Sequence, residues 1–269
     1  MDVREKSHSH LWLLTGTGEG YAFAKSLLRE GWKITISVVS CRASIPYKKF
    51  NLEKILVGAL SSEKDIQSVI LNARNNHGGF HCVIDMTHPF ATKITPKIYK
   101  VCKDLGQPFI RYERPLANIS NAFLINKLSD LSNYNLKNKS ILFALGVRHL
   151  REAITIARGL GANSYARILS NPESLKKTLS SSILNTNFAV LNPSVSSNGE
   201  IEKALLRKWE IDGVVCRQSG GKIENLWQEV CSCMAVDLFL LERPTRIRYN
   251  NSVENYQALI KCLKSISMV

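Results

Sequence analysis

Asp85, Thr87 and His88 place a carboxylate, a hydroxyl and an imidazole within four positions of the chain, directly before Pro89. The apolar residues 82–84 predict a strand that ends at this motif, and a helix start follows it. In open α/β sheets ligands bind at the carboxyl ends of the strands, where this motif would lie. Asp85 and His88 could hold or move a proton there. Because Asp and Thr are also frequent helix caps, the motif by itself fits a capped helix start as well.

A second motif follows a predicted strand at residues 11–14 and leads into an amphipathic helix. Gly31 stands where that helix would end, before another predicted strand at residues 34–39. Glycines let the backbone approach a phosphate, and the start of a helix supplies N–H donors to it. The dinucleotide fingerprint is incomplete, because Tyr21 stands where the third glycine belongs. The candidate phosphate loop consists of Gly16, Thr17, Gly18, Glu19 and Gly20.

The strand at residues 34–39 ends in Ser40, Cys41 and Arg42. A dinucleotide fold that selects NAD usually has an acidic residue here, which binds the ribose 2′-hydroxyl. A serine and an arginine suit a 2′-phosphate instead, so the sequence favours NADPH over NADH. The alternative is that Arg42 is an ordinary solvent-exposed arginine in a loop.

An internal repeat predicts two α/β units of similar plan. Three pairs of segments recur at offsets of 130, 131 and 129 positions. They are LWLLTGTG at 11 with ILFALGVR at 141, the strands around Val83 and Val214, and the Glu-Arg-Pro motifs at Arg114 and Arg243. The boundary is placed at the start of the polar stretch 118–140, which predicts domains at 1–118 and 119–269, the second including a C-terminal amphipathic helix.

The second unit has its own loops after predicted strands, and they are basic. Because the carboxyl ends of parallel strands share one edge, these loops should form a common rim that suits an anion. Backbone N–H groups of a Ser-Gly-Gly turn could add a small anion-binding concavity. Another loop, at residues 192–194, also follows a strand. The candidate ligand-binding residues of this unit are Arg148, His149, Arg217, Ser219, Gly220, Gly221 and Lys222.

The chain of 269 residues has a formal net charge of +14, from 36 Lys and Arg against 22 Asp and Glu. This balance implies anionic partners. No basic block interleaved with aromatics and no helix-turn-helix, RNP or zinc-finger pattern is present, so nucleic acid is not expected. A phosphate-bearing or polycarboxylate small molecule accounts for the charge equally well.

Seven scattered cysteines without a second Cys/His pair at zinc spacing indicate free thiols in a reducing cytoplasm, and no metal site. The polar first ten residues do not read as a signal peptide, and no apolar run reaches the length of a membrane span. We therefore expect a cytoplasmic protein without a membrane partner, either a monomer or a weak oligomer.

Together these motifs resemble the precorrin-6A reductase family, including its cobalt-precorrin-6A branch. The resemblance extends from Leu11 to Pro244. It rests on the loop Gly16–Glu19, on DMTHPFA at 85–91, on RYERP at 111–115, and on the Ser219–Gly221 loop with a closing Glu242-Arg243-Pro244. Two loops depart from the family pattern: Arg217-Gln218 replaces a usual Lys-Asp, and Asn192-Pro193-Ser194-Val195 replaces Gly-Pro-Phe-Ser.

The resemblance implies two Rossmann-like subdomains with parallel sheets and a ligand cleft between them. It implies NADPH-dependent reduction of one double bond in a tetrapyrrole polycarboxylate during cobalamin biosynthesis. NADPH would bind Gly16, Thr17, Gly18, Glu19, Ser40, Arg42, Thr87 and Pro89, and the substrate would bind the basic rim of the second unit. Asp85 and His88 are the candidate acids, with solvent or the substrate itself as alternative proton sources.

Two other readings remain open: a different NADP-binding Rossmann-like reductase, and a non-catalytic tetrapyrrole-binding protein. The sequence leaves undecided whether the ring already carries cobalt, since reductases of both branches share these motifs.

Overall fold

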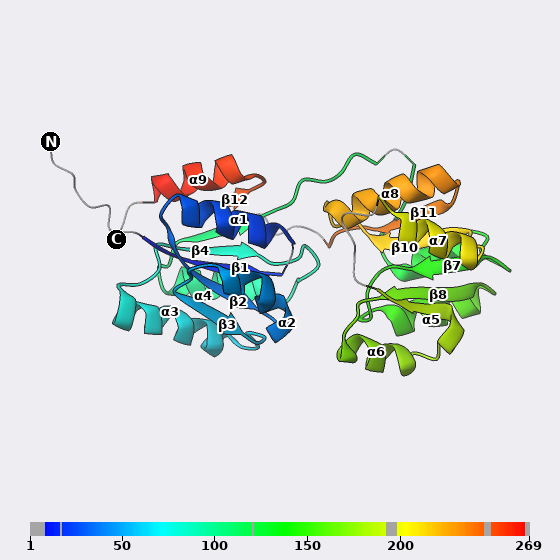
Figure 1. The fold of residues 1–269 in the computed structure, drawn as a ribbon, viewed down its shortest axis with the longest axis horizontal. Helices are drawn as coiled ribbons and strands as arrows, with labels where there is room; N and C mark the ends of the chain where they lie inside the picture. The colour runs from blue at the N-terminus through cyan, green and yellow to red at the C-terminus, as the bar shows by residue number, and fades with distance from the viewer. Residues whose placement is uncertain (1–8, 17, 120, 192–197, 245–248, 267–269) are drawn as a thin grey trace. The chain divides into compact units, whose positions relative to one another are not determined.

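The computed structural model in Figure 1 describes residues 9–16, 18–119, 121–191, 198–244 and 249–266. The chain divides into two compact units, the first formed by Met1–Arg114 with Pro244–Val269 and the second by Pro115–Arg243. Each unit contains its own six-stranded sheet with interspersed helices, which confirms the predicted Rossmann-like α/β fold. Every helix in the described part of the chain is too short or too polar to cross a membrane.

The first sheet has the strand order β12-β5-β4-β1-β2-β3, and every neighbouring pair is parallel. Its strands are β1 (His10–Thr15), β2 (Lys33–Val38), β3 (Lys54–Val57), β4 (Cys82–Met86), β5 (Phe109–Tyr112) and β12 (Ser252–Val253). Its helices are α1 (Gly18–Arg29), α2 (Cys41–Ser44), α3 (Glu63–His77), α4 (Ile94–Asp104) and α9 (Tyr256–Ser265), with a 3-10 turn at Ile45–Lys49.

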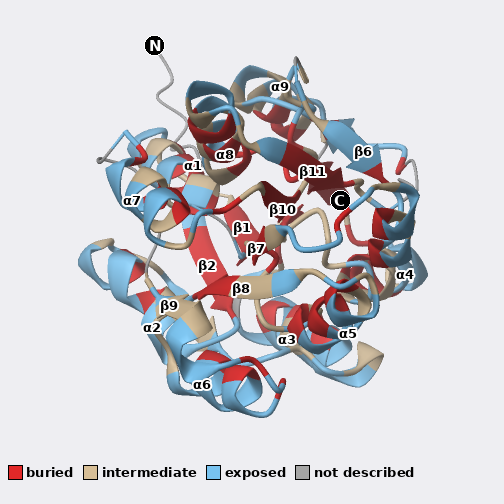
Figure 2. Ribbon diagram, turned by 90° about the vertical axis from the view of Figure 1, so that its right-hand side faces the viewer, coloured by how far each residue is buried: buried red, intermediate tan, exposed pale blue. Residues whose placement is uncertain are grey.

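Apolar cores cover both faces of this sheet, because alternate residues of each strand point to opposite sides. Leu11 and Leu13 of β1 pack with α1 and α9, whereas Trp12 and Leu14 pack with α3 and α4. Figure 2 shows the result: β1 and β2 are buried, and the outer faces of the helices are exposed. The glycine loop leads into α1 as predicted, and Gly31, at φ 85°, follows the end of that helix.

The second sheet has the order β6-β11-β10-β7-β8-β9 and is also parallel throughout. Its strands are β6 (Phe123–Ile125), β7 (Ser140–Phe143), β8 (Asn163–Ile168), β9 (Phe188–Val190), β10 (Gly213–Arg217) and β11 (Asp237–Leu241). Its helices are α5 (Leu150–Gly159), α6 (Pro172–Leu179), α7 (Glu200–Lys208) and α8 (Lys222–Met234), with 3-10 turns at Leu128–Asn133 and Asn185–Asn187.

The two sheets confirm the internal repeat strand by strand. β1, β2, β3, β4 and β5 occupy the same places in the first sheet as β7, β8, β9, β10 and β11 in the second. The edge strands complete the match, since β12 lies beside β5 and β6 lies beside β11. After each Arg-Pro motif the chain crosses to the other unit and supplies its edge strand.

This crossing corrects the predicted domain division. The sequence predicts that the C-terminal helix belongs to the second domain, but Pro244–Val269 belong to the first unit. β12 pairs with β5, and Leu259 and Leu263 of α9 enter the core formed by α1 and β1. The physical reason is that β5 would otherwise be an unpaired edge, and the apolar face of α9 covers that side of the sheet. The first boundary lies between Arg114 and Pro115, a few residues before the predicted one.

Leu259→Ala tests this placement. Leu259 has no exposed surface, so its truncation should cost about 2–5 kcal/mol of unfolding free energy. Leu71→Ala is the matched control, because Leu71 of α3 is 38% exposed and should cost less than about 1 kcal/mol. Urea denaturation measures both values. Hydrogen exchange should place the lost protection in β1, β2 and α1, and a loss confined to the second unit would show that α9 was misassigned.

Candidate functional site

The glycine loop and the Asp85–Pro89 loop lie next to each other at the carboxyl edge of the first sheet. Thr15, the last residue of β1, is paired with Met86, the last residue of β4. A Cβ added to Gly16 would stand 3.8 Å from Thr87 Cα and 3.7 Å from the backbone nitrogen of His88. The two motifs that the sequence singled out are therefore brought together. Thr17 lies outside the described residues.

Gly20 allows the close helix–strand packing that the third glycine of the dinucleotide fingerprint normally allows. A Cβ at this position would meet Thr15 Cβ at 2.8 Å and the Tyr47 hydroxyl at 2.9 Å. Only a residue without a side chain lets the start of α1 lie this close to the end of β1. In dinucleotide folds the third glycine has this function. Here it falls one position before Tyr21, so the spacing rule missed it.

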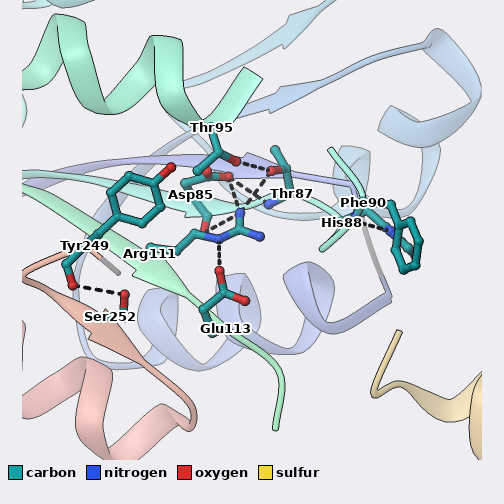
Figure 3. A network of polar contacts seen from close by, with 9 residues as sticks. All are labelled: Asp85, Thr87, His88, Phe90, Thr95, Arg111, Glu113, Tyr249 and Ser252. Atoms are coloured by element: carbon teal, nitrogen blue, oxygen red, sulfur yellow. Dashed lines mark hydrogen bonds and ion pairs between the residues drawn. The ribbon is translucent and has the colours of Figure 1, made fainter. Parts of the chain in front are cut away.

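A buried polar network, drawn in Figure 3, holds the Asp85–Pro89 loop. The Asp85 side chain has no exposed surface, and its Oδ1 lies 2.9 Å from Arg111 Nη1. The same oxygen accepts the backbone N–H of Thr87 at 2.9 Å. Arg111 also donates from Nη1 to Thr87 Oγ1 at 3.0 Å and from Nε to Glu113 Oε1 at 2.8 Å. The Thr87 hydroxyl reaches Thr95 Oγ1 on α4 at 3.2 Å.

Arg111 joins the other members of this network, and the sequence analysis did not select it as a site residue although it lies in the RYERP motif. Burial disfavours its charge, but the carboxylates of Asp85 and Glu113 outweigh that effect and raise the pKa of Arg111. The guanidinium therefore stays charged. Asp85 Oδ2 is buried and has no hydrogen-bond partner among the described residues, so the carboxylate is only partly compensated for its loss of water.

His88 has a different environment from Asp85. It is partly exposed, and Figure 3 shows it beside Phe90, away from the Asp85–Arg111 pair. Its Nδ1 accepts the backbone N–H of Phe90 at 3.2 Å. In the neutral ring this bond assigns the proton to Nε2, which then acts as a donor. Pro89 lies in the turn between these two residues and is also partly exposed.

The remaining predicted residues of the first unit lie at the same edge. Ser40 and Arg42 are exposed after β2, the neighbour of β1, and Ser40 Oγ caps the short helix α2 by accepting Ala43 N–H at 3.3 Å. Glu19, in the first turn of α1, forms an ion pair with Arg114, whose Nη2 lies 2.7 Å from Glu19 Oε2. This pairing moderates a negative charge that would otherwise oppose an anion at the helix start.

The basic candidates of the second unit follow the carboxyl ends of two neighbouring strands of its sheet. Arg217 ends β10, and Arg148 follows the neighbouring strand β7. Burial lowers the pKa of Arg217, and the positive charge of Arg148 lowers it further. His149 stands at the start of α5, with Nδ1 3.6 Å from Glu152 Oε2. Lys222 is exposed at the first position of α8.

The Ser-Gly-Gly turn differs from the expected anion concavity. The N–H of Ser219 donates to Arg217 O at 2.8 Å, and the N–H of Gly220 donates to Glu224 Oε2 at 2.5 Å. Two of the three backbone N–H groups of the turn are thus used within the unit. The acceptor of the Gly220 N–H, Glu224, is only 1% exposed and reaches back from the first turn of α8. Gly221 stands at the cap of that helix.

Arg243 fixes the shape of this turn. Its Nε donates to Gln218 O at 3.0 Å, and its Nη2 donates to Pro115 O at 3.2 Å. Gln218, which replaces the family's acidic residue, accepts Arg243 N–H through its side-chain oxygen at 3.3 Å. The departing loop Asn192–Val195 lies outside the described residues.

The described residues contain no cluster of three or more His, Cys, Asp or Glu that could hold a metal ion. The fold and the loops together define a Rossmann-like protein of two α/β units, with a glycine loop and a buried ion pair at the ligand edge of the first sheet.

Comparison with known proteins identifies the family. The family model described as precorrin-6x reductase CbiJ/CobK matches residues 10–264, so this chain belongs to that family of reductases. A cobalt-precorrin-6A reductase of Synechocystis sp. is 29% identical over 243 residues, which cover 88% of this chain and 89% of the relative. A precorrin-6A reductase of Mycobacterium tuberculosis is 24% identical, covering 86% of this chain and 88% of its own.

The solved structure of a CobK precorrin-6A reductase agrees with the fold. It matches this chain with a TM-score of 0.74 at 17% identity and covers 95% of this chain and 96% of its own. At this identity the likeness concerns the arrangement of strands and helices only.

Gly220→Ala tests the tight turn. Gly220 has φ +64°, and a Cβ there would stand 2.0 Å from Arg243 Nη2 and 2.2 Å from Pro115 O. The left-handed backbone and the collision with a carbonyl should together cost at least about 2 kcal/mol of unfolding free energy. Gly159→Ala is the control, since a Cβ at Gly159 of α5 meets no atom within 4 Å, and alanine favours a helix. Equal melting temperatures for both variants would contradict the structure of the turn.

Proposed function

We propose that this chain is a precorrin-6A reductase that uses NADPH to reduce one double bond of a tetrapyrrole polycarboxylate in cobalamin biosynthesis. The observation that carries the proposal is the family match over residues 10–264, combined with the Asp85–Pro89 loop held against the glycine loop. Relatives named for the precorrin-6A and for the cobalt-precorrin-6A reaction both match this chain. Assaying the purified protein with the metal-free and the cobalt-bearing substrate tests the reaction and its branch. Turnover with neither would favour a non-catalytic binding protein or another reductase.

The first unit fits a nicotinamide dinucleotide. Close packing at Gly20 brings the N–H groups of the first turn of α1 next to the loop after β1, where a pyrophosphate would accept them. Gly16, Thr17 and Gly18 would line the pyrophosphate, and Ser40 and Arg42 the 2′-phosphate. Glu19 would contribute indirectly, because it is paired with Arg114. When bound, the nicotinamide supplies the hydride, and the protein orients it.

Thr87, His88 and Pro89 would border the nicotinamide, since their loop lies against Gly16. The proton that follows the hydride needs a donor that solvent and substrate can reach. His88 is partly exposed, whereas Asp85 is fully buried and paired with Arg111. We therefore assign His88 as the candidate donor of this loop, in its doubly protonated form, in which Nδ1 no longer accepts the Phe90 N–H. Asp85 would hold the loop in place.

The basic loops of the second unit would bind the peripheral carboxylates of the substrate. Burial and then the positive charge of Arg148 lower the pKa of Arg217, and a carboxylate bound by both arginines would favour their charged forms. Arginine forks bind carboxylates through two parallel hydrogen bonds. His149, Lys222 and the Ser219 hydroxyl would add contacts at the same edge, and Gly220 and Gly221 would shape the turn.

Arg42→Ala should discriminate between the two nicotinamide cofactors. Losing a charge-assisted contact to the 2′-phosphate typically costs about 1.5–3 kcal/mol, so the dissociation constant of NADPH should rise roughly 10- to 100-fold. That of NADH, which lacks this phosphate, should stay within about twofold. Fluorescence titration measures both. Arg29→Ala, an exposed arginine at the other end of α1, is the control. Equal losses for both cofactors would exclude Arg42 as the phosphate contact.

Arg217→Ala should raise KM for the tetrapyrrole roughly 10- to 100-fold while leaving kcat and the affinity for NADPH near wild type. The reason is that a peripheral carboxylate is bound equally in the ground state and in the transition state. The salt dependence of KM should also weaken. Lys139→Ala, which removes a surface ion pair with Asp212 in the same unit, is the control. Loss of NADPH binding with intact substrate binding would reverse the assignment of the two units.

A further inference from the structure

The internal repeat offers a control for the buried ion pair of the first unit. Asp85 of β4 is register-paired with Arg111 of β5. The corresponding strands of the second unit are β10 and β11, and the equivalent pair there is Cys216 with Leu240. Both residues are buried, at 2% and 0% exposure, and both are apolar. The same strand order is thus built once around a charged pair and once around an apolar pair.

The sheet therefore does not need charges at this place. Removing a carboxylate and a guanidinium from water is costly, and apolar residues of similar volume are often as stable or more stable. The cost is only partly offset in the first unit, since Asp85 Oδ2 has no hydrogen-bond partner among the described residues. Because the Asp85–Arg111 pair is costly to bury and the strand order does not require it, we expect the pair to serve the site.

The contacts of the pair show what it does in addition to joining two strands. Through Asp85 Oδ1 and Arg111 Nη1 it binds both the backbone N–H and the hydroxyl of Thr87. In the second unit the loop after β10 is held differently, by Glu224 and Arg243. The charged pair is thus specific to the loop that carries Thr87, His88 and Pro89.

We infer that Arg111 is a positioning residue, which with Asp85 holds the Thr87–Pro89 loop against Gly16 so that NADPH is bound in the reactive orientation. Arg111 itself is 3% exposed and acts through Thr87. The planar guanidinium suits this place because Nη1 contacts Asp85 and Thr87 while Nε, a separate atom in a fixed plane, contacts Glu113, whereas an ammonium donates from a single point. The part that concerns NADPH rests on the proposed function, whereas the holding of the loop does not.

The test transfers the apolar pair of the second unit into the first, as the double variant Asp85→Cys/Arg111→Leu. Arg111→Leu leaves the buried Asp85 carboxylate unpaired, and Asp85→Cys leaves Arg111 with Glu113 as its remaining carboxylate partner, so each single variant should lower the midpoint of urea unfolding. The double variant should recover part of that loss, since it removes both charges of the pair but also leaves Glu113 without Arg111. It should nevertheless bind NADPH roughly 10-fold or more weakly, and its kcat should fall roughly 100-fold, because small misplacements of reactants are costly. Lys100→Ala, which breaks an exposed ion pair with Glu63 in the same unit, is the control and should behave as wild type.

Hydrogen exchange of the cofactor-free protein gives a readout that does not depend on activity. The Thr87 amide should lose protection in the double variant, because its acceptor Asp85 Oδ1 is gone, while the amides of β1 and β4 stay protected. Arg111→Lys keeps the charge and the fold but not the fork, and it should show the same loss at Thr87 and a weaker affinity for NADPH.

Three results would overturn the inference. The double variant could fail to fold, which would make the pair a requirement of the sheet. It could retain wild-type protection at Thr87 and wild-type NADPH affinity, or Arg111→Lys could retain both. If wild type itself neither binds NADPH nor reduces the tetrapyrrole, the proposed function fails, and the exchange data still decide whether Arg111 holds the loop.

Discussion

Every strand of both sheets runs parallel to its neighbours, and this constraint determines where chemistry can occur. Crossover connections return the chain to the opposite edge after each strand, and because all strands of a sheet run in the same direction, their carboxyl ends lie at a single edge. Segments that are far apart in the chain meet there: the glycine loop after β1, Ser40 and Arg42 after β2, and the Asp85–Pro89 loop after β4. The direction of the strands alone therefore brings these three segments to one edge of the sheet.

The two units of the repeat have used this common plan differently. In the first, a charged pair between β4 and β5 fixes the loop that follows β4. In the second, the equivalent strand positions are apolar, and the loop is fixed from α8 and from the strand end by Glu224 and Arg243. Buried charge is costly, so a charged pair at this register position in only one unit distinguishes residues that shape a site from residues that only complete the fold.

The two Glu-Arg-Pro motifs act at equivalent places. Each arginine follows the last strand before the chain crosses to the other unit and turns back to a loop at the ligand edge of its own unit. Arg114 reaches Glu19 at the start of α1, and Arg243 reaches the turn at Gln218 and Gly220. The residues after each motif then supply the edge strand of the opposite sheet, so that both sheets have six strands.

Local patterns in the sequence were sufficient for the strands around 11–14, 34–39 and 82–84, for the glycine loop, for the repeat and for the family resemblance. These features depend on residue spacing along one segment, or on similarity between segments. The partner of Asp85, the pairing of Glu19 with Arg114, the engaged N–H of Gly220 and the placement of α9 in the first unit came only from the tertiary structure. These four features depend on how distant segments of the chain are brought together, or on which sheet edge is left unpaired. The spacing of residues along one segment does not determine the strand register or the unpaired edge.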